Sequence, residues 1–273
     1  MLRFARQTPD HQIPVTFTGA IGRACNYPLR LIIAACVKLG IHPNLLTFIG
    51  VLINGAAGWA LSQGHFLTAG GIMIVANIFD FIDGKVAHES GKMSEFGGFW
   101  DSVIDRFSDL ALWVGLIALY ASMGRTDYVL ITAVAMVFAT MTSYTRARAE
   151  SLIARCKVGF MERPERIVLF WIGAFTNRMA AVVWVIGVLS IVSVINRIQY
   201  TYLELNRRPQ PRRSGPFGFF VRAFYWTWTD ERTTLAYDLW VIAILAFVWL
   251  TPPDWLGDPM AEGGLGFLQW LMR

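Results

Sequence analysis

The stretch that decides the fold runs from Asn77 to Asp109 and reads NIFDFIDGKVAHESGKMSEFGGFWDSVIDRFSD. It carries acidic residues where a lipid-facing segment is expected to have none. Asp80 and Asp83 stand three residues apart, so on a helix both side chains project from one face. The same argument holds for Asp101 and Asp105, which stand four apart. A polar, glycine-bearing turn separates the pairs and allows the two helices to fold back, which would bring the four acids together.

Four carboxylates in an apolar setting repel one another unless they are protonated or neutralised by cations. A ligand set made only of oxygen atoms suits Mg²⁺ or Mn²⁺. We therefore predict a divalent-metal site inside a membrane protein, with the four aspartates as its ligands.

The composition excludes an ordinary soluble domain. The 273 residues are 55% hydrophobic and 16% charged, and the mean hydropathy is +0.46, as in helical membrane proteins. The net charge of +5 suits nucleic acid, an anionic membrane surface or an anionic substrate. The apolar runs favour the last two, so we expect membrane lipids as partners and no nucleic acid. Cys25, Cys36 and Cys156 form no close pair, so we expect small buried residues and neither a zinc cluster nor a disulfide framework.

Apolar runs near the length that crosses a bilayer, about 20 residues, recur along the chain. The first lies after a polar start, so we expect no cleavable signal peptide. A break at His42-Pro43 precedes it, and Asn44 or Thr47 is expected to cap the helix that follows. The fifth run is short, and its boundary near Asn177 is the least defined. The predicted spans are 44–62, 66–87, 97–122, 127–147, 165–177, 179–200 and 234–252.

The two ends of the chain differ from this pattern. Between Val15 and Leu39 basic residues interrupt apolar ones, which is typical of a helix lying along the headgroups; a short first crossing is the alternative. Residues 206–232 combine proline, arginine and aromatics, which suits a segment at headgroup level. We therefore predict an all-α, polytopic membrane bundle with a six-helix core, an amphipathic N-terminal helix and an extra C-terminal span. Its three parts are an N-terminal segment, a membrane domain and a tail, at 1–42, 43–205 and 206–273.

Positive charge tests this threading independently. With the N-terminus in the cytoplasm, nearly all lysines and arginines fall on the inner side, including those from Arg197 to Arg232, while Arg106 lies within a span. Only Arg125, Arg178 and Arg273 fall outside. The threading predicts a multi-pass protein of the cell membrane whose aspartate site faces the cytoplasm.

The central stretch also fits a fixed pattern, D-x-x-D-G-x-x-A followed after nine residues by G-x-x-x-D-x-x-x-D, and this resembles the signature of the CDP-alcohol phosphotransferase family. These membrane enzymes make phospholipids from a CDP-linked lipid and an alcohol. The resemblance implies two Mg²⁺ (or Mn²⁺) ions held by the aspartates, with Asp105 also as general base, and a homodimer. It also implies that Gly84 and Ala87, which lack bulky side chains, leave space for the cytidine. The pattern is formed by Asp80, Asp83, Gly84, Ala87, Gly97, Asp101 and Asp105.

The residues make chemical sense without the family. Displacing CMP from a CDP-lipid requires neutralising the pyrophosphate and aiming an alcohol in line with the phosphorus, and two cations held by carboxylates do both. A further carboxylate near the incoming hydroxyl can take its proton. One departure is His88, which stands where the family usually has arginine; it reaches less far and is only partly charged near neutrality, which puts that nucleotide contact in doubt.

Two further features suit a CDP-lipid site. The run Pro43-Asn44-Leu45-Leu46-Thr47 resembles the entry to the family's first span, where Asn44 to Thr47 contact the CDP-lipid; alone it is only a helix cap. Ser94 falls where the family often has Ser or Thr near the nucleotide, and its alternative role is to cap the third span.

A basic run, SYTRARAESLIARCKVGFMERPER, follows from Ser143 to Arg166. It resembles the branch of the family that makes phosphatidylinositol phosphate and its archaeal ether-lipid counterpart. A dianionic phosphate on the acceptor needs arginines, whose forked donors match phosphate oxygens. Glu150 and Glu162 are expected to orient these arginines, and the alternative is that they only enforce the positive-inside rule or bind lipid headgroups. The candidates for holding inositol phosphate are Arg146, Arg148, Arg163 and Arg166.

We therefore expect an enzyme that joins CDP-diacylglycerol to a small polar alcohol, most plausibly inositol phosphate, with glycerol phosphate or another alcohol next. The rival from another class is a cation- or proton-coupled transporter that uses the aspartates as its coordination site, but no internal repeat supports it. A third alternative is an inactive relative, which the His88 departure keeps open.

Overall fold

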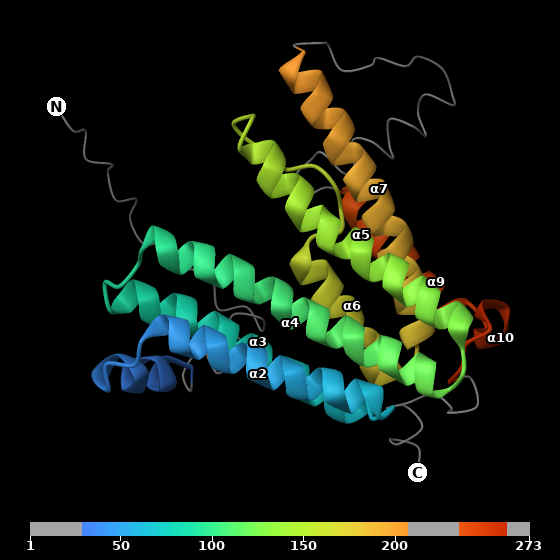
Figure 1. Cartoon of the computed structure of the whole chain (residues 1–273), viewed down its shortest axis with the longest axis horizontal. Coiled ribbons are helices and arrows are strands. Elements are labelled where there is room, and N and C mark those ends of the chain that lie inside the picture. The colour runs from blue at the N-terminus through green and yellow to red at the C-terminus, as the bar shows by residue number, and fades with distance from the viewer. Residues whose placement is uncertain (1–28, 207–234, 261–273) are drawn as a thin grey trace.

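The computed structural model describes residues 29–206 and 235–260, and every regular element among them is a helix. Residues 29–38 are helical. The basic, aromatic run predicted at headgroup level and most of the N-terminal segment lie outside the described residues. Figure 1 shows α2, α3 and α4 side by side, with α5 and α7 crossing above them. The helices are α2 Pro43–Ser62, α3 Phe66–Glu89, α4 Glu95–Ser122, α5 Thr126–Glu150, α6 Arg163–Thr176, α7 Met179–Leu205, α9 Leu235–Leu250 and α10 Pro253–Leu256.

Each of the seven predicted spans falls on one of these helices. By length and composition, α2, α3, α5 and α7 are able to cross a membrane. The 28-residue α4 is continuous but carries charged residues in its first half, and α6 and α9 are shorter, with 14 and 16 residues. The all-helical, multi-pass membrane fold expected from the sequence is therefore confirmed.

Helix ends show one correction. We expected Asn44 or Thr47 to cap α2, but the N-cap is His42, whose Nδ1 accepts from the backbone N–H of Asn44 at 3.3 Å. Pro43 explains this, because proline favours the first helical position and moves the cap to the residue before it. Ser94 caps α4, accepting from Gly97 N at 3.0 Å.

Two glycines let α2 and α4 touch backbone to backbone. A Cβ atom on Gly58 would overlap the carbonyl of Ala111, and one on Gly115 would overlap the carbonyl of Gly58. Small residues permit such close packing in membrane helices. This contact lies in the C-terminal halves of α2 and α4 and holds the two helices side by side.

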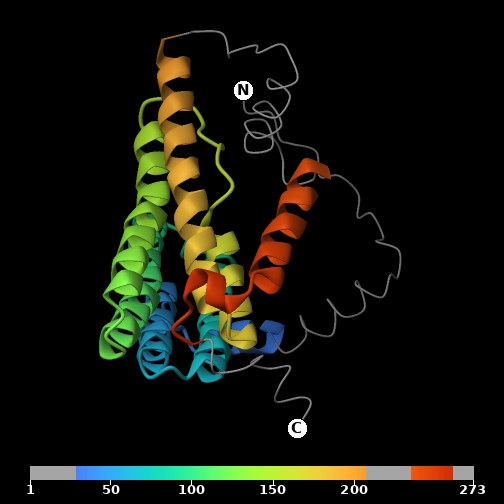
Figure 2. The same cartoon turned by 90° about the vertical axis from the view of Figure 1, so that its right-hand side faces the viewer.

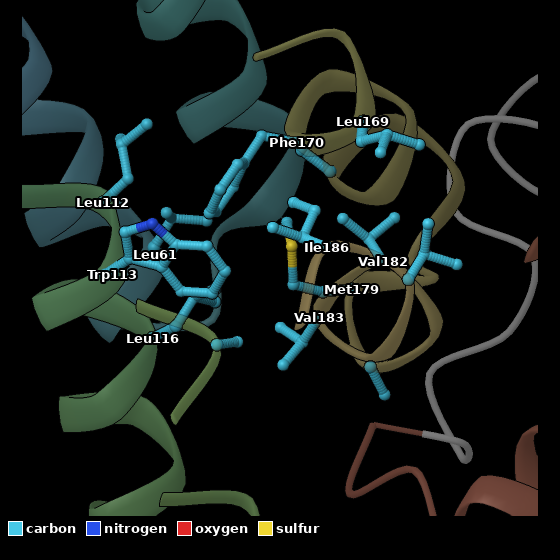
Figure 3. Close-up of a cluster of buried hydrophobic side chains, with 14 of the residues drawn as sticks. Leu61, Leu112, Trp113, Leu116, Leu169, Phe170, Met179, Val182, Val183 and Ile186 are labelled. Atoms are coloured by element: carbon cyan, nitrogen blue, oxygen red, sulfur yellow. The ribbon is translucent and has the colours of Figure 1, made fainter. Parts of the chain in front are cut away.

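The apolar core lies at the same level of α4, around Trp113. The ring of Trp113 meets that of Phe170 edge-on, with the centroids 4.9 Å apart (Figure 3). Such pairs add about 0.5–1.5 kcal/mol beyond their area burial. Met179 and Ile186 of α7 complete this cluster. The core therefore holds α6 and α7 against α4 and sets the position of the first turn of α6.

The helix at 29–38 packs on the acid-bearing end of the bundle. Its Ile33 and Cys36 lie with Leu46 of α2 and with Ile82 and Val86 of α3 in one buried cluster. It therefore covers the ends of α2 and α3, and Cys36 is a small buried residue as predicted.

The C-terminal segment closes the opposite end. Figure 2 shows α9 approaching α7 towards the C-terminal end of α9, and Ile244 and Val248 are buried in the core. Beyond α9 the side chains of the bundle bind backbone carbonyls: Arg178 donates to Thr251 O at 3.1 Å and Tyr128 to Leu256 O at 2.6 Å. The extra C-terminal helix is thus bonded to the bundle at the end away from the acids.

Candidate active site

Three of the four predicted ligands meet between α3 and α4. Asp80 lies near the C-terminal end of α3, while Asp101 and Asp105 lie on the first turns of α4. Each offers a carboxylate oxygen, and these oxygens all lie within 4.8 Å of one another. The fold-back of two neighbouring helices, predicted from the spacing, therefore brings this trio together.

Asp83 lies outside this trio. Its side chain is only 5% exposed, and its Oδ2 has no hydrogen-bond partner among the described residues. A buried carboxylate oxygen is costly when nothing pairs with it. The unsatisfied oxygen and the all-oxygen donor set together fit a divalent cation.

Arg163 joins the acids from the first turn of α6. Its NH1 lies 3.0 Å from Asp80 Oδ2, its NH2 lies 2.9 Å from Asp105 Oδ1, and its Nε lies 3.4 Å from Asp109 Oδ1. The guanidinium is thus shared by three carboxylates on two helices. Of the four predicted arginines, this is the one that touches the acid trio.

Arg166 lies behind Arg163 and is 4% exposed. Its NH2 is 2.8 Å from Asp109 Oδ2, and its NH1 donates to Thr142 Oγ1 at 3.0 Å. Asp109 therefore binds both arginines of α6.

Arg146 lies beside the expected glutamates, with its NH1 2.8 Å from Glu162 and its Nε 3.2 Å from Glu150. Of the four candidate arginines, Arg146 is the one that pairs with these glutamates. Arg148 is exposed and donates to Ser151 Oγ at 3.2 Å. The structure thus divides the four arginines between the acid trio, a buried position behind it, the Glu162 region and an exposed turn.

A fifth arginine completes this side of the bundle. Arg197 of α7 is 2% exposed, donates to Val158 O at 2.8 Å and lies 3.6 Å from Glu162. Through Val158 it fixes the loop between α5 and α6, where Cys156 is buried as predicted. Burial raises the pKa of the Cys156 thiol.

Asp109 and Arg197 were missed as site residues by the sequence analysis. Asp109 continues the four-residue spacing of Asp101 and Asp105 by one more turn. Arg197 is an isolated charge in α7, the most hydrophobic of the four helices able to cross a membrane. Charged residues within spans are functional by default, and that rule would have found both.

The residues proposed for the nucleotide lie at the adjoining ends of α2, α3 and α4. A Cβ atom added to Gly97 would lie 3.1 Å from Ser94 Oγ and 3.9 Å from Asn44 Oδ1, so these three residues are neighbours. A Cβ atom on Gly84 would meet nothing within 4 Å, so the face of α3 at Gly84 is open.

The rest of this set divides by exposure. Leu45 and His88 are exposed, and Ala87 is half-buried. Thr47 is buried and its Oγ1 donates to Pro43 O at 3.2 Å, while Leu46 is packed in the cluster with Ile82 and Val86. The side chain of Leu46 therefore contributes packing at this end of the bundle.

The arrangement is comparable with that of known proteins. Residues 40–199 match the family described as CDP-alcohol phosphatidyltransferase. The archaetidylinositol phosphate synthase of Pyrococcus horikoshii is 37% identical over 172 residues, which are 63% of this chain and 89% of that protein. The phosphatidylinositol phosphate synthase of Mycobacteroides abscessus is 30% identical over 174 residues, 60% of this chain and 79% of that protein.

Solved structures give the same result. The phosphatidylinositol phosphate synthase of Mycobacterium tuberculosis with CDP-DAG bound is 26% identical, with a TM-score of 0.60, over 64% of this chain and 93% of that one. The same protein in complex with manganese and citrate is 25% identical, with a TM-score of 0.58, over 64% and 88%. The rival reading as a transporter finds no support in these relatives. The chain belongs to the CDP-alcohol phosphatidyltransferase family.

Proposed function

We propose that the protein transfers the phosphatidyl group of CDP-diacylglycerol to inositol phosphate and releases CMP. The observation that carries this proposal is that Arg163, from the basic segment, contacts Asp80 and Asp105 directly. A donor suited to the acceptor's phosphate thus lies beside the acids that would serve the pyrophosphate. The names of the relatives support the same acceptor.

The four aspartates Asp80, Asp83, Asp101 and Asp105 would hold two Mg²⁺ or Mn²⁺ ions. When bound, these ions would supply positive charge that offsets the charge of the pyrophosphate. The oxygen-only donors and the unsatisfied Oδ2 of Asp83 support this role, and a solved relative is a complex with manganese.

The chain's own groups account for the proton and the orientation of the substrates. Asp105 accepts the proton of the acceptor hydroxyl while the oxygen of that hydroxyl bonds to the phosphatidyl phosphorus. The bond from that phosphorus to the bridging oxygen breaks, and CMP leaves with that oxygen. The open face at Gly84 suits the cytidine diphosphate, and the remaining proposed contacts are Asn44, Leu45, Leu46, Thr47, Ala87, His88, Ser94 and Gly97.

The acceptor's phosphate would be held by arginines from α5 and α6. Arg163 is nearest to the reacting centre, and Arg166 lies behind it. Arg146 and Arg148 extend the basic surface along the last turn of α5. Glycerol phosphate is the alternative acceptor, because the metal residues define the reaction and only the arginines distinguish the alcohol.

We further propose that the site faces the cytoplasm and that the protein is a homodimer, with the division into 1–42, 43–205 and 206–273. The orientation is supported by the basic residues Lys85, Lys92, Arg146 and Arg148, which lie on the helix ends and turn beside the acids. The dimer rests on the family resemblance. Cysteine labelling from either side of sealed vesicles tests the orientation of the site, and cross-linking in the membrane tests the homodimer.

The function is tested by measuring CMP release from CDP-diacylglycerol with a panel of alcohols. We expect Mg²⁺- or Mn²⁺-dependent release with inositol phosphate, and much less with glycerol phosphate, glycerol or inositol. The same reaction with Asp105→Asn should fail. Release with glycerol phosphate alone would reassign the acceptor, and no release with any alcohol would favour an inactive relative.

A further inference from the structure

Asp109 is not part of the pattern that identifies the family, yet it has more charged partners than Asp101. It lies one turn beyond Asp105 on α4, so Asp101, Asp105 and Asp109 follow one another at four-residue spacing along one helix face. Its Oδ1 lies 3.4 Å from Arg163 Nε, and its Oδ2 lies 2.8 Å from Arg166 NH2. One carboxylate therefore binds two arginines of α6.

The way Arg163 divides its donors is informative. Its Nε faces Asp109, whereas its two terminal nitrogens face Asp80 and Asp105. A guanidinium is planar and rigid, so holding its Nε edge also sets the direction of its other two nitrogens. Asp109 thus fixes the side of Arg163 that points away from the acid trio.

Arg166 supports Asp109 from behind. It is 4% exposed, and its NH1 donates to Thr142 Oγ1 and Met161 O. Asp109 is the acidic partner of Arg166 that the structure describes, and a buried charge requires one. The carboxylate is held in place by a partner that does not reach the acid trio.

We propose that Asp109 is a positioning residue for the acceptor: it orients Arg163 so that its terminal nitrogens face the reacting centre. The proposal rests on the proposed function, because it assigns Arg163 to the acceptor's phosphate. Without the charge of Asp109, Arg163 is drawn wholly to Asp80 and Asp105. Its nitrogens are then less available to a phosphate, while CDP-lipid contacts on α2 and α3 are unchanged.

The first experiment is Asp109→Asn in the full-length protein, assayed with inositol phosphate and with unphosphorylated inositol. We expect the KM for inositol phosphate to rise about tenfold or more, with kcat, the KM for CDP-diacylglycerol and Mn²⁺ affinity within about threefold. The preference for the phosphorylated acceptor should fall. Asp109→Glu should restore part of it. Asp127→Asn, the same change in an exposed pair at the other end of the bundle, is the matched control.

A purely structural role through Arg166 predicts a different pattern, which a double-mutant cycle separates. If Asp109 only neutralises Arg166, then Asp109→Asn with Arg166→Gln should equal Arg166→Gln alone in acceptor KM. If Asp109 also orients Arg163, the double variant should have the higher KM. The double variant also removes the buried unpaired charge, so it remains measurable where Asp109→Asn alone fails to fold.

Direct binding of inositol phosphate, measured by calorimetry with Mn²⁺ present and no CDP-lipid, gives a readout independent of turnover. Weaker binding by Asp109→Asn with unchanged Mn²⁺ binding supports the proposal. Equal loss of kcat for every acceptor at unchanged KM overturns it, as does a double variant equal to Arg166→Gln. If the wild-type protein shows no acceptor-dependent CMP release, the proposed function fails first. If the wild-type protein releases CMP with inositol phosphate but Asp109→Asn keeps the wild-type acceptor KM and acceptor preference, this inference fails alone.

Discussion

The two ends of this bundle use aspartate and arginine in opposite ways. At the end closed by the C-terminal segment, Arg125 pairs with its neighbour Asp127 at 2.7 Å, both side chains being at least one third exposed, and also donates to Gly257 O. At the acid end, one guanidinium, that of Arg163, is shared by carboxylates of α3 and α4. The pair of Arg125 and Asp127 joins neighbouring residues and closes a turn. Arg163 instead joins distant segments into a site that has more carboxylates than arginines in contact with them.

The largest effect is expected from Asp105→Asn. The change removes a proposed ligand and the proposed base together, and general bases alone contribute 10²–10⁴-fold. We expect CMP release to fall by about 10³-fold or more, and chelation of divalent ions to abolish it in the wild-type protein. Asp127→Asn at the other end should leave the rate within about twofold. Comparable losses in the two variants would remove the contrast between the ends.

The second effect concerns Arg163→Gln. The change removes charge-assisted bonds to Asp80 and Asp105 and the donor proposed for the acceptor. Truncating one member of a buried charge pair at a binding site costs about 2–5 kcal/mol, so the acceptor KM should rise about 30-fold or more. Arg163→Lys should recover little, because ammonium lacks the fork. Arg125→Gln is the control, and steady-state kinetics with varied inositol phosphate is the measurement.

The third effect tests the close backbone contact between α2 and α4 at Gly58. Gly58→Leu places a side chain into the backbone of α4, and overpacking of this kind costs about 1–3 kcal/mol or more. We expect a lower unfolding temperature in detergent and reduced CMP release. Gly55→Leu is the matched control, because a Cβ atom there meets nothing within 4 Å. If both variants melt alike, the close packing of α2 and α4 does not stabilise the bundle.

The smallest effect is expected at the closed end. Tyr128→Phe removes the hydroxyl that donates to Leu256 O, and one hydrogen bond contributes about 0.5–1.5 kcal/mol. A slightly lower unfolding temperature with unchanged kcat and KM would confirm that this end is structural. A change in acceptor KM would instead mean that the two ends are coupled.

Much of the fold follows from local patterns in the sequence. Apolar run length alone located the helices, and the spacing of Asp80, Asp101 and Asp105 was enough to bring them together, because α3 and α4 are consecutive. The sequence was less informative where partners lie far apart along the chain. The bonds from Arg163 to Asp80 and from Arg197 to Val158 join segments 83 and 39 residues apart, and no periodicity encodes them. The cap at His42 was missed because proline shifts the boundary by one residue.

The bonds that fasten the C-terminal segment have a consequence for descent. Thr251, Leu256 and Gly257 are all bound through their main-chain oxygens. Every amino acid offers that oxygen, so mutations can accumulate there while the attachment persists. Homologues with dissimilar residues at this end can therefore keep the same main-chain hydrogen bonds. Their relationship would be visible in superposed backbones but not in a sequence alignment.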